Sequence, residues 1–137
     1  MNGSFKQYAA VLLRLALGAV FIVHGWGKLA DMASTIGFFG KVGIPAPGFF
    51  AWVVAIVEFG GGLAVLLGIG TRLASALIAC VMVVAIFTVK LSQGFVGGWE
   101  FDFSLLMIAL SLLILGSGPL SINAAREGGS GGEGAQI

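Results

Sequence analysis

Four long apolar stretches constrain the fold of this chain more than any other feature of its sequence. A helix crosses the hydrocarbon core of a bilayer in about 20 residues, and tilt or local thinning accommodates a shorter one. The apolar residues run continuously instead of alternating, which disfavours β-strands. With 58% hydrophobic and 9% charged residues, the chain is predicted to be an all-α membrane protein, a four-helix transmembrane bundle within residues 1–120. The predicted spans are about 8–28, 49–69, 73–89 and 101–117.

The segments outside the spans differ in character. The first connection, 29–48, is long and half apolar, and we expect a short interfacial helix within it at about 31–41. Gly43 and Pro45 would end that helix. Residues 121–137 are rich in Gly, Ser and Glu, so this tail is expected to be disordered.

Charged and aromatic residues beside the spans suggest an orientation. With the N-terminus inside, the cations on or near the cytoplasmic side are Lys6, Arg14, Arg72 and Arg126, and those on the other side are Lys28, Lys41 and Lys90. This narrow bias favours cytoplasmic N- and C-termini. One aromatic belt on the opposite interface is formed by Trp26, Trp52 and Trp99.

Metal and redox centres are limited by the scarcity of ligands. Cys80 is the one cysteine and His24 the one histidine of the chain. A single cysteine excludes an intrachain disulfide and a thiolate zinc site, and a single histidine excludes bis-histidine haem within one chain. We therefore expect no cofactor held covalently or by metal ligation. The net charge of +1 and the lack of a basic run argue against a nucleic-acid partner.

Arg14 and Glu58 are ionisable residues inside the apolar stretches. A charge at the bilayer centre costs roughly 2.5–3.5 kcal/mol on insertion scales, so it persists mainly where it has a partner or a function. Arg14 lies about 5 Å from the centre of its span and Glu58 lies near the centre of its own span. We expect the two to form an ion pair. Such a pair either fixes the register of two helices or lines a polar cavity, and both interpretations stay open.

A second polar group is expected at the tryptophan side of the bundle. His24 and Lys28 are four residues apart on one helix face, and Glu100 begins the fourth span, so these groups can meet at one mouth. A histidine can carry a proton near neutral pH; the alternative is an interfacial histidine bonded to a backbone carbonyl. The simplest interpretation of Lys28, Lys41, Lys90 and Asp102 is that they are solvated span ends.

The candidate site residues follow from these two groups. Candidate catalytic residues are Arg14, His24 and Glu58. Candidate binding residues are Arg14, His24, Trp26, Lys28, Glu58 and Glu100. No metal site is expected.

An ordered set of motifs over residues 10–120 resembles the DoxX family. The set is Arg14-x-x-x-Gly18-x-x-Phe21-x-x-His24-Gly25-x-x-Lys28-Leu29, Gly43-Ile44-Pro45-x-Pro47, Glu58-x-x-Gly61-Gly62 and Gly68-x-Gly70-Thr71-Arg72. The resemblance implies a small bacterial inner-membrane protein with four helices. It also implies a link to redox processes: family branches resemble a subunit of a thiosulfate–quinone oxidoreductase or are tied to oxidative stress and to quinone and catechol detoxification.

Two classes of function are consistent with these expectations. In the first, the protein is a quinone-linked redox component or a subunit of a membrane oxidoreductase complex. Arg14 or His24 would donate a hydrogen bond to a quinone carbonyl, Glu58 would pass the proton, and a partner or substrate would supply electrons. In the second, the protein is a scaffold or anchor that recruits soluble redox enzymes; a transporter is a distant third. The expected partners are the lipid bilayer, a quinone, and another protein or a second copy of the chain.

Overall fold

The chain folds into helices throughout the part that its structure describes. The computed structural model describes residues 3–130, and no strand occurs among them. The helices are α1 (Gly3–Ala30), α2 (Met32–Lys41), α3 (Pro47–Leu67), α4 (Thr71–Ala85), α5 (Glu100–Leu115) and α6 (Ile122–Ser130). Between α4 and α5 the chain forms two π-helical turns, Ile86–Lys90 and Phe95–Trp99, separated by the 3₁₀ turn Leu91–Gln93.

Four helical segments in the described residues are long and apolar enough to cross a membrane: Phe5–Ala30, Pro47–Leu67, Thr71–Gln93 and Phe95–Leu115. The prediction of an all-α, four-span membrane protein is therefore confirmed. The third and fourth spans are longer than the sequence stretches 73–89 and 101–117, because the π and 3₁₀ turns extend both helices toward each other.

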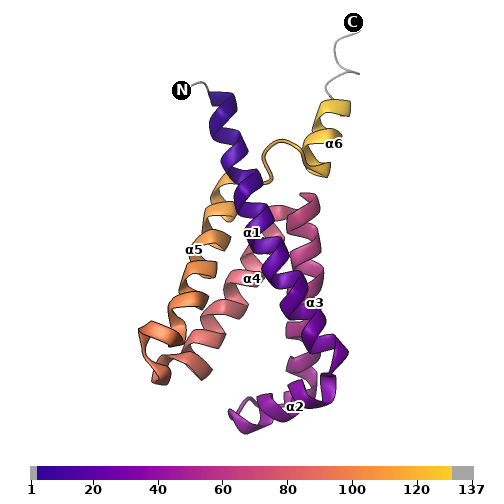
Figure 1. Ribbon diagram of the computed structural model, residues 1–137. Coiled ribbons are helices and arrows are strands. Elements are labelled where there is room, and N and C mark those ends of the chain that lie inside the picture. The colour runs from indigo at the N-terminus through magenta and orange to yellow at the C-terminus, as the bar shows by residue number, and fades with distance from the viewer. Residues whose placement is uncertain (1–2, 131–137) are drawn as a thin grey trace, which may run out of the picture.

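The spans form two helix pairs, α1 with α3 and α4 with α5. In Figure 1 these pairs approach each other at the end where α1 begins and α5 ends, and they separate toward the opposite end. The helix α2 packs against α3 and lies across that open end. The wide end of the bundle is also the end that carries the predicted tryptophan belt, because Trp26 is near the end of α1 and Trp52 near the start of α3.

Glycines bring the backbones of α1 and α3 into direct contact. A Cβ atom on Gly25 would lie 2.7 Å from the Cα atom of Phe59, and one on Gly62 would lie 2.8 Å from the backbone nitrogen of Ile22. Small residues allow such close approach where membrane helices pack without a hydrophobic driving force between them. These contacts set the antiparallel register in which residue 25 faces residue 59 and residue 22 faces residue 62.

The first connection contains the expected short helix, because α2 covers Met32–Lys41. Its first turn is capped by Asp31, whose carboxylate accepts hydrogen bonds from the Ser34 backbone amide at 3.2 Å and the Ser34 hydroxyl at 2.8 Å. An Asp at this position satisfies amide groups that have no partner within the helix.

The beginning of the tail differs from the prediction of disorder from residue 121. The segment Ile122–Ser130 forms α6, while residues 131–137 lie outside the described part of the chain. The reason is local docking. The Ser121 hydroxyl accepts a hydrogen bond from the backbone amide of Ala124, and the backbone amide of Asn123 donates to the Gly68 carbonyl, each at 3.0 Å. Composition alone does not reveal these contacts.

Candidate functional site

Arg14 lies at the narrow end of the bundle, where it binds backbone carbonyls. The side chain is only 3% exposed. Its Nε donates to Val65 at 2.9 Å and its two terminal nitrogens donate to four more carbonyl oxygens. Those four acceptors are Leu66 at 2.8 Å and Ser117, Pro119 and Leu120 at 3.1 Å each. The predicted Arg14–Glu58 ion pair is therefore wrong.

The register of α1 against α3 explains the error. The prediction placed the centres of both spans at the same depth, near residues 18 and 59. In the structure a Cβ atom on Gly18 would lie 3.0 Å from the Cβ atom of Leu66, so the centre of the first span faces the end of the second. Arg14 consequently faces backbone carbonyl oxygens in the last turn of α3, the part of a helix that has few N–H donors of its own for these acceptors. Glu58 lies about two helical turns away along α3.

Glu58 pairs instead with Lys28 from α1. The Lys28 Nζ atom is 2.8 Å from the Glu58 Oε2 atom, and the Glu58 residue is 4% exposed. The interpretation of Lys28 as a solvated span end is therefore corrected: its ammonium group points to a buried carboxylate. The pairing offsets part of the desolvation cost that a carboxylate bears in the interior.

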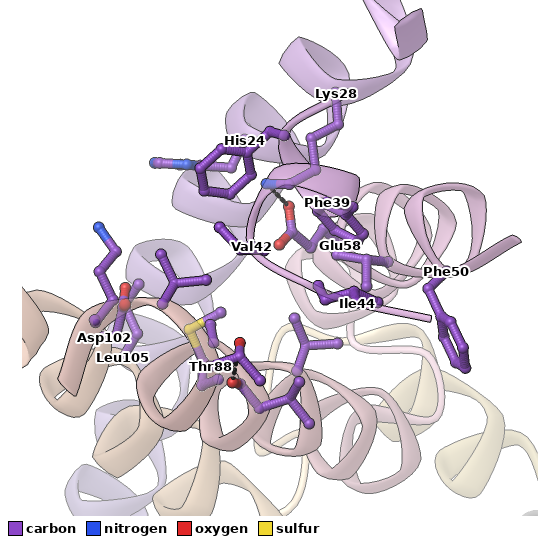
Figure 2. Close-up of a pocket in the computed structure, with 18 of the residues that line it drawn as sticks. His24, Lys28, Phe39, Val42, Ile44, Phe50, Glu58, Thr88, Asp102 and Leu105 are labelled. Carbon is purple, nitrogen blue, oxygen red and sulfur yellow. Dashed lines mark hydrogen bonds and ion pairs between the residues drawn. The ribbon is translucent and has the colours of Figure 1, made fainter. Parts of the chain in front are cut away.

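A cavity of about 690 Å³ occupies the wide end of the bundle between the two helix pairs (Figure 2). Its wall is mostly apolar and includes residues of α1, α3, α4 and α5, with α2 and the following loop over it. The polar and charged residues that line it are His24, Lys28, Glu58, Thr88, Lys90, Gln93 and Asp102. Lys28 and Glu58 meet on one wall, and Asp102 lies beside Leu105 on another.

Asp102 is a functional candidate that the sequence analysis missed. It had been interpreted as a solvated span end, yet it is 8% exposed and its Oδ2 atom is buried without a hydrogen-bond partner. The burial follows from helical spacing, because Asp102 shares a buried stripe of α5 with Leu105, Ala109 and Leu112. That stripe is a signal that the sequence contained.

The other predicted site residues lie in different places. His24 lines the cavity, with its ring centroid 6.2 Å from that of Phe101. Trp26 is 61% exposed, and its ring lies 6.1 Å from that of Phe59, outside the cavity lining. Glu100 accepts a hydrogen bond from the Gly97 amide at 3.2 Å in the turn before α5. The structure therefore brings together His24, Lys28 and Glu58, but not Arg14, Trp26 or Glu100.

The chemistry available in the cavity is hydrogen bonding and proton exchange within an apolar enclosure. Ligand sites in proteins are typically concave and apolar, with a few polar groups that orient the ligand. Among the described residues, no group of three or more His, Cys, Asp and Glu side chains is placed to hold a metal ion. With about 690 Å³, the cavity lies within the size range of small-molecule sites, roughly 300–1,000 Å³.

The chain is similar to one family model and to several known proteins. A family model described as DoxX matches residues 9–91. The chain is 42% identical over 123 residues, covering 90% of both chains, to a protein of Bacillus subtilis named "Putative oxidoreductase CatD". It is 35% identical over 130 residues to an uncharacterized membrane protein of Mycobacterium tuberculosis, covering 84% of this chain and 79% of the relative.

A further relative matches over a shorter length. The chain is 37% identical over 67 residues to an inner membrane protein of Escherichia coli, YqjF, covering 49% of this chain and 50% of the relative. No solved structure matches the chain.

Proposed function

This chain belongs to the DoxX family, and we propose that it binds a quinone in the cavity at the wide end of the bundle and serves as a quinone-linked component of a membrane oxidoreductase system. The observation that carries the proposal is the combination of an apolar cavity of about 690 Å³ with His24 and the Lys28–Glu58 pair on its wall. A bare membrane anchor needs no such enclosure.

The lining supplies the two kinds of contact that a quinone needs. A quinone ring is flat and apolar on both faces, and its carbonyl oxygens accept hydrogen bonds. The aromatic side chains of Phe38, Phe39 and Phe101 lie along the cavity and offer apolar contact to a ring. His24 and Lys28 carry N–H groups that donate to a carbonyl oxygen. Arg14 has no part in this proposal, because its donors are bound to backbone carbonyls at the other end of the bundle.

The redox role is supported by the name of a relative. The protein of Bacillus subtilis is named a putative oxidoreductase and matches over 90% of this chain. In the proposed reaction sequence, electrons come from a protein partner or a reduced substrate. The chain supplies the quinone site, and Glu58, held by Lys28, relays to the quinone the protons that accompany those electrons. The alternative is a scaffold that recruits soluble redox enzymes, and it predicts no ligand in the cavity.

Quinone binding is tested by equilibrium titration of the purified chain in nanodiscs with a short-chain ubiquinone, with empty nanodiscs subtracted to remove partition into lipid. We expect saturable, one-to-one binding. His24→Leu should weaken it by up to about tenfold, the effect of one lost hydrogen bond. Lys41→Leu is a matched control, because Lys41 is an exposed cation at the end of α2 that does not line the cavity. Absence of saturable binding to the wild-type chain would favour the scaffold.

A further inference from the structure

Asp102 is the buried carboxyl group that the proposed quinone site does not use. It projects from the first turn of α5 into the cavity wall, opposite the α1–α3 pair that carries Lys28 and Glu58. The residue is more than nine-tenths buried, and its Oδ2 atom has no hydrogen-bond partner among the described residues. Native proteins satisfy the great majority of buried polar atoms, so an exception of this kind calls for an explanation.

The two carboxyl groups of the cavity, on Glu58 and Asp102, differ in whether they have a polar partner. Glu58 is engaged by an ammonium group at 2.8 Å. Asp102 has no such partner at its Oδ2 atom, although the first turn of a helix favours a negative charge through the helix dipole. An ionised carboxyl group is a hydrogen-bond acceptor only. In the ionised form, which the helix dipole favours, the missing partner of Asp102 is a donor. The Oδ2 atom is itself buried, so a donor in the cavity meets the carboxyl group at the face with which Asp102 lines the cavity.

We propose that Asp102 is a binding residue that accepts a hydrogen bond from a hydroxyl group of the ligand, and that it makes the site prefer a hydroxylated ring, a quinol, over the corresponding quinone. This inference rests on the proposed function. A quinol presents O–H donors where a quinone presents carbonyl oxygens. A carboxylate binds the donor and repels the carbonyl oxygen, so the same residue discriminates between the two redox forms of one ring.

The discrimination has an expected size. A hydrogen bond to a charged group contributes more than one between neutral groups, and its loss corresponds to about tenfold or more in affinity. The wild-type chain should thus bind a quinol at least about tenfold more tightly than the matching quinone. Two of the other donors that line the cavity, on His24 and Lys28, bind the oxygen at the opposite side of the ring in both forms.

The test is a pair of anaerobic titrations of the full chain in nanodiscs, one with a short-chain ubiquinol and one with the matching ubiquinone. Asp102→Leu should lose about tenfold in quinol affinity and, because the repulsion of the carbonyl oxygen is removed as well, gain affinity for the quinone. Asp102→Asn carries an amide donor that suits a carbonyl, so its preference should fall to about one or reverse. Ser104→Ala is the control on the same helix, because the Ser104 hydroxyl donates to the Glu100 carbonyl outside the cavity.

Each outcome of this test has a distinct meaning. Equal affinity of the wild-type chain for both forms, or an unchanged preference in both Asp102 variants, would overturn the assignment of Asp102 and leave quinone binding intact. Binding of neither form would overturn the quinone site and the assignment together. Thermal unfolding of the variants separates binding from folding: removal of a carboxyl group without a partner should leave the midpoint of Asp102→Leu close to that of the wild-type chain, whereas a structural role would lower it.

Discussion

At the residue scale, Arg14 connects three parts of the chain: α1, the end of α3 and the segment 117–120. Its guanidinium group joins the end of α3 to the segment 117–120 that follows α5, through donors that reach five carbonyl oxygens. A planar group with five N–H donors suits this task in a way that a lysine does not. Arg14, which the sequence analysis placed in an ion pair with Glu58, therefore holds these segments of the bundle together.

Arg14→Met should destabilise the protein strongly. The substitution removes five hydrogen bonds to carbonyl groups that are buried or partly buried, and a fully buried acceptor left without a donor costs about 1–3 kcal/mol, so we expect a loss of about 3 kcal/mol in the free energy of unfolding. Arg14→Lys should recover only a minor part of it. Unfolding in mixed micelles measures the change, and Arg126→Met, an exposed arginine on α6, is the matched control.

A double-mutant cycle separates this role from an ion pair with Glu58. Because Glu58 pairs with Lys28 and Arg14 does not contact it, the effects of Arg14→Met and Glu58→Gln should add, while Lys28→Met and Glu58→Gln should couple. Strong coupling between Arg14 and Glu58 would contradict the arrangement described above.

At the scale of elements, the contact between α1 and α3 depends on Gly25. A methyl group there would lie 2.7 Å from the Cα atom and 2.8 Å from the Cβ atom of Phe59, closer than atoms pack. Gly25→Ala should therefore push the helices apart and cost about 1–3 kcal/mol of stability, the usual effect of overpacking. Gly27→Ala on the same helix is the control, because nothing lies within 4 Å of its added methyl group. A thermal midpoint lowered equally by both would refute the contact.

The start of α2 should respond to acid through Asp31, which lies outside the membrane spans. Hydrogen bonds from the Ser34 hydroxyl and the Ser34 amide lower the pKa of this carboxyl below its ordinary value of 3.8. A lowered folded pKa means that the cap contributes fully above the ordinary value and is lost as pH falls through the folded one. The Ser34 amide chemical shift should titrate with a midpoint below 3.8. Asp31→Ser should keep a cap but lose the titration; a midpoint at or above 3.8 would exclude the cap.

At the scale of the whole molecule, the sequence predicts the elements better than their partners. Continuous apolar runs predict four spans, and the turn residues Gly43 and Pro45 predict the end of α2, because these signals are local. The partner of Arg14 is not local: depth along a span does not give the register between two spans, which Gly25 and Gly62 set by close contact. Asp102 was missed for a different reason: a charged residue at the start of a span was interpreted as solvated, although its spacing to Leu105, Ala109 and Leu112 indicates the buried face of α5.

The even number of spans also makes a topological prediction. The helix α1 begins and α5 ends at the narrow end of the bundle, while α2 lies at the wide end (Figure 1). Reporter fusions that are active on one side of the membrane only should give the same signal at the N-terminus, at Arg72 and after α6, and the opposite signal in the segment 42–46 and at Gly97.

The cationic residues favour a cytoplasmic narrow end. Adding two lysines to segment 42–46 should then weaken insertion, because it places positive charge on the translocated side, whereas adding two glutamates should change it little. Opposite signals from the two termini would exclude the four-span arrangement. Matching signals with the narrow end on the non-cytoplasmic side would keep the arrangement and reverse its orientation, which would turn the open end of the cavity toward the cytoplasm.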